Sequence, residues 1–357
     1  MSKKVKIGLI GTGGIAQWAH IPGYLSIPDQ AEIVWACDIK EDLAKEIAAK
    51  HDIPKVTTDY KDILNDPEID AVSELTPNKV HMQPTIDALN AGKHVLCEKP
   101  LSMNADQSRK MCRAAADSGK ILQVALQQRF TGEGQFMKKF IDAGGMGDIY
   151  YARSMALRRR GVPGWGVFID KEQQGGGPLI DIGVHALDFT LFLMGYPKPV
   201  SASGKTWNML GTNPELYNGW GDYDRTKFTV EDFAVGFIRF DNGAVVVLES
   251  SFMGNMEGNP YGCNVYGTKA GAEIRFSGDK PVRVFTESDR QLWDMSPANL
   301  PDVPSPHTAE IQTFVKTIQE GGQSAVPGLN GLILNAIFDA LYKSAETGRE
   351  EAIDVSF

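Results

Sequence analysis

The chain has 357 residues, of which 42% are hydrophobic and 23% charged, and its formal net charge is −9. This length exceeds one ordinary domain and predicts two, with enough apolar residues for two hydrophobic cores. The acidic balance argues against a surface that binds nucleic acid or an anionic membrane.

Membrane and redox features of the sequence predict a protein of a reducing compartment. No apolar run approaches the roughly 20 residues of a membrane span, and the first four residues lead directly into a predicted strand, which leaves no room for a signal peptide. Four cysteines, at positions 37, 97, 112 and 263, lack C-x-x-C spacing. We therefore expect buried free thiols, no membrane partner and a cytoplasmic location.

A glycine-rich segment follows a strand predicted over Lys6–Ile10. Residues 11–16 read G-T-G-G-I-A and open a predicted helix. Gly11 permits a tight turn, Gly13 lets the backbone approach phosphate groups, and Ala16 allows close packing of helix and strand. Free N–H groups and the positive end of the helix dipole attract an anion. The pattern predicts a fold that holds a dinucleotide by its pyrophosphate.

A second strand, predicted over Ala31–Cys37, runs into Asp38, which lies 22 residues after Ala16. A carboxylate there accepts hydrogen bonds from ribose hydroxyls and repels a 2′-phosphate, which favours NAD over NADP. Two alternatives stay open. Asp38 and Glu41 have the spacing of a capping box, and Lys40 is compatible with NADP.

Strand and helix patterns alternate as far as residue 126. After Asp38 we predict a helix over 42–50, a strand from 56, a strand over 69–75, a helix over 80–91, a strand over 94–97, a helix from the N-cap Asn104 to 118, and a strand over 121–126. Strands that are apolar throughout predict a parallel sheet covered on both faces, with its ligand at the carboxyl ends of the strands. Residues 1–126 are therefore interpreted as a doubly wound α/β domain.

The pattern changes at Gln127. A helix over 135–143 precedes strands predicted over 149–157, 200–207, 233–240, 244–252, 263–266 and 282–285, with helices over 308–320 and 332–345 that pack back on the body. Asp241-Asn242-Gly243 is a strong hairpin signal. Residues 127–357 are interpreted as an α+β domain whose mostly antiparallel, open-faced sheet suits self-association. The stretch Asn208–Thr226 is rich in Gly, Asn and Asp and is predicted to be a long loop.

Polar residues follow two neighbouring strands of the first domain. Residues 75–78 read L-T-P-N, with His81 shortly after, and this position passes under the expected cofactor. The same residues are also typical of a helix entry. Glu98-Lys99-Pro100 ends the next strand, where the Lys99 ammonium can hydrogen-bond a substrate hydroxyl and stabilise alkoxide character. A surface lysine beside a turn proline is the alternative.

The second domain contains a segment, Gly175–Asp188, that combines glycines with ionisable residues. Asp181 and His185 are four residues apart and would share one helix face, which Asp188 continues. An imidazole that titrates near neutral pH can accept a hydroxyl proton during alcohol oxidation, and a carboxylate one turn earlier can orient it or hold substrate. A structural His–Asp pair and a partial metal site are the alternatives. Because the other histidines show no partner spacing, we expect no metal.

Residues 158–165 read R-R-R-G-V-P-G-W. A basic run beside an aromatic can frame a polar substrate, since sugar rings stack their C–H faces on tryptophan. Arg159 and Trp165 are therefore candidate substrate residues. A solvated basic surface is the alternative.

Taken together, these motifs resemble the Gfo/Idh/MocA oxidoreductase family. The resemblance covers essentially the whole chain, and the E-K-P and D-I-G-x-H motifs, in that order behind the glycine fingerprint, are specific. The matching segments are 11–16, 76–78 with His81, 98–100, 175–188, 265–272 and 344–348. The predicted loop of residues 208–226 is longer than expected for a simple member of this family.

The resemblance implies a Rossmann domain followed by an open-faced α/β domain whose sheet mediates homo-oligomers, either dimers or a homotetramer. It implies Lys99 and His185 as the catalytic pair and Asp181 as a substrate-binding and orienting group. Cofactor contacts are implied at Gly11, Gly13, Gly14, Ile15, Ala16, Asp38, Thr76, Asn78, His81, Glu98, Lys99 and Gln127. The expected substrate-binding residues are Lys99, Arg129, Arg159, Trp165, Asp181 and His185.

The function expected from these residues is a reversible, NAD-dependent dehydrogenation of a secondary alcohol on a sugar, sugar derivative or cyclitol, with NADP as the alternative cofactor. One rival is the NAD-dependent glycosidase branch of the family, in which bound cofactor is transiently changed and regenerated in each cycle. Another is a non-catalytic NAD-binding sugar sensor or co-regulator.

Overall fold

The computed structural model describes residues 3–276 and 278–357. The chain forms two compact units. The first contains the described residues up to Phe130 together with Val303–Leu332 and Ser356–Phe357, and the second contains Thr131–Asp302 and Ile333–Val355. The division expected from the sequence, 1–126 and 127–357, differs from these units chiefly because Val303–Leu332 belongs to the first one.

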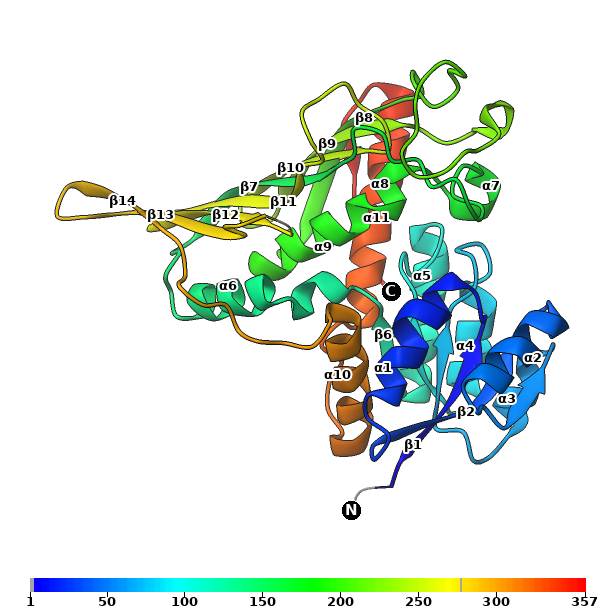
Figure 1. The fold of residues 1–357 in the computed structure, drawn as a ribbon. Helices are drawn as coiled ribbons and strands as arrows, with labels where there is room; N and C mark the ends of the chain where they lie inside the picture. Colours follow the sequence, from blue (N-terminus) through cyan, green and yellow to red (C-terminus); the bar gives the residue numbers. More distant parts are fainter. Residues whose placement is uncertain (1–2, 277) are drawn as a thin grey trace. The chain divides into compact units, whose positions relative to one another are not determined.

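A six-stranded parallel sheet forms the centre of the first unit (Figure 1). Its strand order is β3-β2-β1-β4-β5-β6. The strands are β1 Val5–Ile10, β2 Ala31–Cys37, β3 Lys55–Thr57, β4 Ala71–Glu74, β5 His94–Cys97 and β6 Leu122–Val124. The order reverses between β1 and β4, and ligands of such sheets bind at the carboxyl ends of the strands at this switch point. The predicted Rossmann-type sheet is confirmed.

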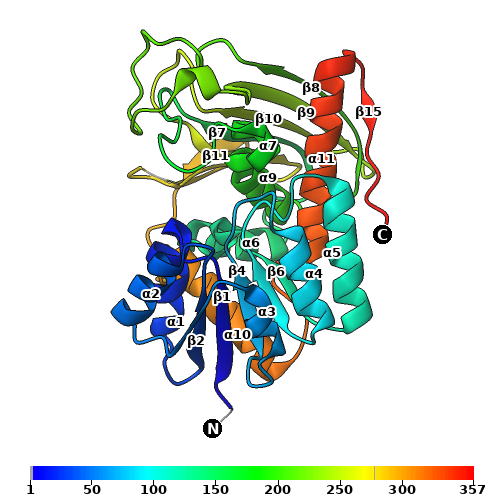
Figure 2. The same cartoon turned by 90° about the vertical axis from the view of Figure 1, so that its right-hand side faces the viewer.

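Helices cover both faces of this sheet. They are α1 Ile21–Leu25, α2 Glu41–Lys50, α3 Tyr60–Asn65, α4 Met82–Asn90, α5 Ala105–Ser118 and α10 Pro306–Glu320. Tyr24 of α1 and Phe314 of α10 share one buried cluster with Leu9 of β1. On the other face, a Cβ at Gly8 would lie 2.3 Å from Ile63 of α3. The helices α4 and α5 lie side by side (Figure 2). Because Phe314 of α10 is buried in the cluster with Leu9, residues 303–332 belong to the first unit.

The second unit contains a nine-stranded sheet in the order β14-β13-β12-β11-β7-β10-β9-β8-β15. The strands are β7 Ile149–Leu157, β8 Pro199–Trp207, β9 Phe233–Phe240, β10 Val245–Ser251, β11 Tyr261–Gly267, β12 Ala270–Arg275, β13 Val282–Ser288, β14 Gln291–Met295 and β15 Glu351–Ala352. The pair β7–β10 is parallel and the other pairs are antiparallel. The predicted hairpin joins β9 and β10, with Gly243 at φ +84°. The mostly antiparallel sheet is confirmed.

The helices of this unit are α6 Gly132–Asp142, α7 Lys171–Gln174, α8 Pro178–Asp181, α9 Gly183–Leu193 and α11 Gly328–Thr347, which begins in the first unit. The helices α8, α9 and α11 pack on the sheet, and α6 packs on α9. Figure 1 shows α8, α9 and α11 on the same side of the strands. A Cβ at Gly204 or Gly236 would lie 2.8 or 2.7 Å from Leu341 of α11, so glycines in β8 and β9 permit the close approach of this helix.

In the described part of the chain, no single helix is both long and apolar enough to cross a membrane. One bent helix pair, Lys171–Asp181 with Gly183–Leu193, meets the criterion by length and composition alone.

Candidate active site

The glycine-rich segment lies at the switch point of the first sheet. Gly11 has φ +99°, and a Cβ there would lie 2.9 Å from the carbonyl oxygen of Leu75, which follows β4. A side chain is therefore excluded on two grounds. A Cβ at Gly13 or Gly14 would meet open space, so the backbone there is accessible to a ligand. The helical segment that follows starts with a π-helical turn, Ala16–His20, before α1.

Asp38 holds the glycine-rich segment rather than the next helix. Its Oδ2 accepts hydrogen bonds from the Thr12 amide at 3.0 Å and from the Thr12 hydroxyl at 3.1 Å. Its Oδ1 accepts one from the Lys40 amide at 3.0 Å. Lys40 is the N-cap of α2 and no side chain caps this helix, so the capping alternative for Asp38 is wrong. The carboxylate lies beside the loop, where an acid that binds ribose is expected.

Two loops that follow β4 and β5 are joined by a buried histidine. The ring of His81 is 1% exposed, with Nδ1 2.9 Å from the Pro100 carbonyl and Nε2 2.7 Å from the Thr76 carbonyl. Burial lowers the pKa of His81, although both carbonyl contacts oppose this. A direct contact with a cofactor would require the ring to leave these bonds. The arrangement therefore makes His81 a residue that positions the Thr76 and Pro100 loops.

Lys99 lies at the carboxyl end of β5, next to a buried acidic residue. The Nε2–H of His20 donates to Glu98 Oε1 at 3.1 Å, and the Lys99 amide donates to Glu98 Oε2 at 3.0 Å. Burial would raise the pKa of Glu98, but the hydrogen bond from His20 and the charges of His20, Lys99 and His307 hold it below its usual value. Glu98 is therefore an anion beside the Lys99 backbone. His20 of the π-helical turn donates a hydrogen bond to it, and His307 of α10 acts on it electrostatically.

Sequence reasoning missed the contribution of His20 and His307 to this site. His307 is in the first turn of α10, and its ring contacts Trp18 edge-on at 4.6 Å between centroids. The partners of these histidines lie far away in the sequence, so no local spacing could have identified them.

The short 3-10 helix Gln127–Phe130 contains two predicted site residues. Gln127 is partly exposed after β6. Arg129 is 4% exposed, and its guanidinium donates to the Ala325 carbonyl at 3.1 Å and to Asn330 Oδ1 at 3.0 Å. Arg129 therefore holds the 325–330 segment, and its contact with a ligand stays a prediction.

Asp181 and His185 lie on two helices of the second unit, and both are buried. The sequence predicted one straight helix with both residues on one face. Instead α8 ends at Asp181, Ile182 has φ −109°, and α9 begins at Gly183. The two segments are bent by 45°. Asp188, predicted to continue the face, is buried and accepts a hydrogen bond from the Tyr196 hydroxyl, so it is structural.

A buried carboxylate fixes the start of α8. Glu231 accepts hydrogen bonds from the Gly177 amide at 2.9 Å, the Leu179 amide at 3.1 Å and the Tyr342 hydroxyl at 2.9 Å. A Cβ at Gly177 would lie 2.3 Å from the Glu231 carbonyl oxygen, and one at Gly176 would lie 1.9 Å from the Tyr342 hydroxyl. These contacts explain the glycines before Asp181. Sequence reasoning missed both Glu231 and Tyr342.

The basic segment after β7 contains one arginine that faces inward. The Arg158 guanidinium interacts electrostatically with Asp181 and lies 3.9 Å from the Trp220 ring centroid. Burial lowers the pKa of Arg158, and Asp181 opposes this shift. Arg159 and Trp165, the predicted substrate residues, are exposed. Neighbouring side chains in an extended segment point to opposite sides, so only one of Arg158 and Arg159 can face inward. The sequence pattern did not show which of the two it is.

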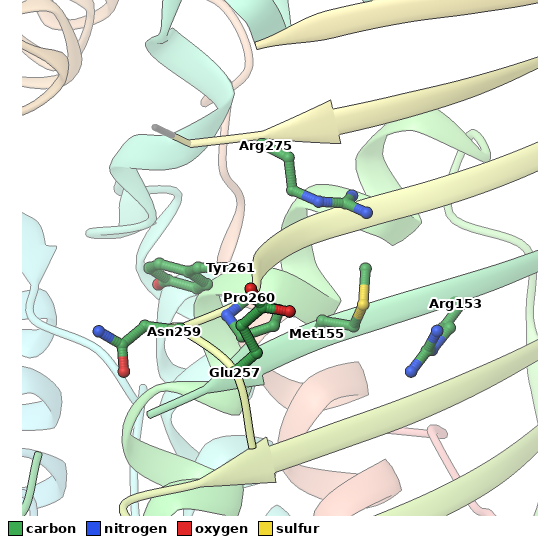
Figure 3. Close-up of a pocket in the computed structure, with 8 residues that line it drawn as sticks. Arg153, Met155, Glu257, Asn259, Pro260, Tyr261 and Arg275 are labelled. Atoms are coloured by element: carbon green, nitrogen blue, oxygen red, sulfur yellow. The ribbon is translucent and has the colours of Figure 1, made fainter. Parts of the chain in front are cut away.

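A polar pocket lies between β7, β11, β12 and the loop before β11 (Figure 3). Its two arginines are ion-paired with glutamates of the sheet, Arg153 with Glu249 at 2.5 Å and Arg275 with Glu273 at 3.3 Å. None of the residues predicted for the site lines it. We therefore do not assign the reaction to this pocket. Across residues 3–276 and 278–357, no cluster of three or more His, Cys, Asp or Glu side chains suits a metal ion.

Comparison with family models matches both parts of the chain. The model of an oxidoreductase family with an NAD-binding Rossmann fold matches residues 5–126, and that of the GFO/IDH/MocA C-terminal domain matches residues 135–273. The chain belongs to the Gfo/Idh/MocA family. As a member of this family, it is an NAD-binding oxidoreductase.

Two curated members of the Gfo/Idh/MocA family and one solved structure span nearly the whole chain. The D-glucoside 3-dehydrogenase of Escherichia coli (strain K12) is 35% identical over 348 residues, which cover 97% of each chain. The scyllo-inositol 2-dehydrogenase (NAD(+)) of Bacillus subtilis (strain 168) is 27% identical over 99% of this chain and 98% of its own. A levoglucosan dehydrogenase in complex with NADH has a TM-score of 0.85 at 25% identity, covering 99% of this chain and 100% of its own.

The first unit has the features that a Gfo/Idh/MocA member needs for NAD. The backbone at Gly13 and Gly14 is open, Gly11 permits the turn beside Leu75, and the Asp38 carboxylate lies against Thr12. These residues can hold the pyrophosphate and the adenosine ribose.

Proposed function

We propose that the protein catalyses a reversible, NAD-dependent oxidation of a secondary alcohol on a sugar, sugar derivative or cyclitol. Residues 1–126 hold the dinucleotide, and residues 127–357 bind substrate and mediate self-association. The observation that carries the proposal is Lys99 at the carboxyl end of β5, beside the switch-point strands of an NAD-binding fold. Relatives named for D-glucoside and scyllo-inositol support a polyhydroxylated ring as the substrate.

The cofactor site in this proposal follows the edge of the first sheet. The glycine-rich segment takes the pyrophosphate, and Asp38 takes the adenosine ribose and favours NAD over NADP. His81 acts indirectly, by fixing the Thr76 loop. The residues proposed to contact or border NAD are Gly11, Gly13, Gly14, Ile15, Ala16, Asp38, Thr76, Asn78, Glu98, Lys99 and Gln127.

The chemistry requires one proton acceptor and one group that stabilises negative charge on oxygen. When bound, NAD⁺ supplies the oxidant that takes the hydrogen and its electron pair from the carbinol carbon. His185 accepts the hydroxyl proton, and the Lys99 ammonium donates a hydrogen bond to the oxygen as alkoxide character develops. Asp181 orients the imidazole or holds a neighbouring hydroxyl. Arg159 and Trp165, which are exposed, are the remaining substrate candidates, whereas Arg129 is committed to the 325–330 segment.

Self-association through the nine-stranded sheet is part of this proposal. One face of the sheet carries helices, and the opposite face exposes aromatic side chains such as Phe237 and Tyr266. A sheet face with exposed aromatic side chains suits a symmetric contact with a second copy, to give a dimer or a homotetramer. The four cysteines are free and buried, which agrees with a cytoplasmic protein.

A cofactor-reduction screen tests this function. The protein is incubated with NAD⁺ or NADP⁺ and a panel of aldoses, glycosides and inositols, and absorbance of the reduced cofactor is followed. We expect net reduction of NAD⁺, and we expect His185→Ala to lower turnover about 10²- to 10⁴-fold while NAD⁺ affinity is retained.

His51→Ala, at the end of α2, is the matched control and should leave turnover unchanged. Full activity of His185→Ala would contradict the assignment of the proton acceptor. Release of sugar from a glycoside without net cofactor reduction would favour the glycosidase alternative instead, and tight NAD⁺ binding with no turnover of any sugar would favour a sensor.

A further inference from the structure

The long loop of residues 208–226 is fixed to the second unit by buried hydrogen bonds. At its start, Asp232 Oδ2 accepts from the amides of Met209 at 2.7 Å, Leu210 at 2.5 Å and Gly211 at 2.7 Å. Asp232 is itself buried after the loop ends. One carboxylate therefore fixes three successive amides and sets the direction in which the loop leaves β8.

The middle of the loop binds the segment that contains Trp165. The Asn218 side chain donates to the Val162 carbonyl at 2.8 Å and accepts from the Val162 amide at 3.0 Å. The Gly164 amide donates to the Trp220 carbonyl at 2.9 Å. A Cβ at Gly164 would lie 2.6 Å from the carbonyl carbon of Gly221, so a glycine at position 164 permits the two backbones to touch. The loop and the segment 162–165 thus form one joined surface.

This joint places two tryptophans together. The indoles of Trp165 and Trp220 are nearly parallel, at 10°, with ring centroids 6.0 Å apart. Phe168 supports this pair edge-on, with its ring centroid 6.4 Å from that of Trp165. Trp165 is 57% exposed and Trp220 is 41% exposed. Single exposed aromatics are common, but two adjacent parallel indoles held by specific hydrogen bonds form a patch suited to a ligand.

Arg158 connects this aromatic patch with Asp181 in the segment Gly175–Asp188. Its guanidinium lies 3.9 Å from the Trp220 centroid and donates to the Gly161 carbonyl at 3.0 Å. The same group interacts electrostatically with Asp181. A cation over an indole fixes the orientation of that ring. The patch is therefore tied to the acidic residue that we propose to hold substrate.

We propose that Trp165 and Trp220 form a subsite for a second ring, so that the preferred substrates are glycosides whose aglycone is itself a sugar or another ring. This inference rests on the proposed function and deepens it. The C–H faces of a pyranose match a flat aromatic surface, and Trp165 is the more exposed of the two indoles. Residues 208–226 would then determine specificity for the part of the substrate that does not react.

Kinetics with matched glycosides test the subsite. Cellobiose and maltose carry a pyranose aglycone, whereas methyl β-D-glucopyranoside and methyl α-D-glucopyranoside carry the same oxidisable ring with a one-carbon aglycone. We expect wild-type protein to prefer the disaccharides in kcat/KM. Trp165→Ala should lower kcat/KM for the disaccharides about five- to tenfold more than for the methyl glucosides, because the second ring loses the more exposed of the two indoles, whereas Arg158 covers one face of Trp220.

Trp165→Phe retains an aromatic ring and should restore most of the preference, which guards against a folding defect in Trp165→Ala. Trp293→Ala, an exposed tryptophan on β14, is the control and should change neither class. Titration of intrinsic fluorescence with cellobiose, with NAD⁺ present, measures binding independently of turnover.

The possible failures are distinguishable. The same ratio of kcat/KM between the two substrate classes in wild type and Trp165→Ala, with turnover intact, would overturn the subsite alone. Turnover of cyclitols or free sugars but of no glycoside would do the same. Absence of turnover with every sugar would contradict the proposed function, and absence of cellobiose binding in the titration would then overturn the subsite as well.

Discussion

Glu74 is a buried carboxyl at the carboxyl end of β4, close to the switch point of the first sheet. Its Oε1 accepts hydrogen bonds from the Thr76 amide at 3.2 Å and from the Thr76 hydroxyl. Its Oε2 has no hydrogen-bond partner among the residues that the structure describes. Burial raises the pKa of Glu74 to about 8, against the opposing effect of the Thr76 bonds. The unpartnered oxygen therefore carries a proton at neutral pH.

This protonation predicts how stability changes with pH. Between its ordinary pKa and about 8, the folded protein holds a proton that the unfolded chain releases, so stability falls as pH rises through this window. Glu74→Gln is uncharged throughout and escapes this loss. We expect the variant to be more stable than wild type by on the order of 1–3 kcal/mol at pH 9. Thermal unfolding between pH 5 and pH 9 measures the difference.

The two unfolding curves should cross on the acid side. At pH 5 the amide introduced by Glu74→Gln offers a donor where no acceptor lies, so the variant should be equal to or less stable than wild type. Glu46→Gln, on the exposed face of α2, should follow wild type at every pH. A constant offset between Glu74→Gln and wild type from pH 5 to pH 9 would show that Glu74 does not titrate in this range.

At the scale of elements, the short helix α8 depends on a distant strand for its position. Glu231 precedes β9 and holds the Gly177 and Leu179 amides, so it positions Asp181 without contacting substrate. Glu231→Gln keeps the size of the side chain, but its amide faces the Gly177 amide as a second donor. We expect kcat to fall about 10- to 100-fold, with a smaller change in KM, because α8 is displaced rather than a binding group removed.

Hydrogen exchange separates this positioning role from a general loss of stability. Glu231→Gln should lose protection of the amides of residues 177–182 while the strands of the second sheet stay protected. Glu346→Gln, an exposed glutamate on α11, should change neither kcat nor exchange. Unchanged protection at 177–182 together with a reduced kcat would argue that Glu231 acts in some other way.

Elements with local signals were predictable from the sequence. The predicted N-cap Asn104 accepts a hydrogen bond from the Gln107 amide at 3.0 Å, and α5 ends at Ser118, as predicted. The 241–243 turn also joins the strands that it was expected to join. Each of these features depends on residues a few positions apart, so propensity and capping chemistry suffice to locate it.

Features of the site that depend on distant partners were not predictable. The start of α8 is fixed by Glu231, which lies 54 positions from Gly177. His20 and Glu98 are 78 positions apart. Sequence pattern also does not show that the buried Arg129 donates to the Ala325 carbonyl and to the Asn330 side chain, because these partners lie 196 and 201 positions away.

At the scale of the whole molecule, the open face of the second sheet is the surface that we propose to contact a second copy. Phe237 of β9 is 36% exposed, opposite Ser203 of β8 and Val247 of β10. The Arg239 guanidinium lies 4.8 Å from the Phe237 ring centroid. The neighbouring Arg153–Glu249 pair is neutral as a unit. A face that combines exposed aromatics with paired charges can be buried against its own copy without leaving unpaired charge.

Phe237→Glu tests whether this face makes the oligomer. In a symmetric contact the substitution places one new charge on each copy, so both would be buried without a partner. We expect wild type to elute as a dimer or tetramer in size-exclusion chromatography with light scattering, and Phe237→Glu to associate at least about 100-fold more weakly. Leu25→Glu, an exposed apolar position on α1, should keep the wild-type mass. A monomeric wild type at micromolar concentration would contradict the proposed self-association. An unchanged mass for Phe237→Glu with retained NAD⁺ binding would place the oligomer contact elsewhere, because unpaired glutamates cannot be buried at this position without a large cost in association free energy.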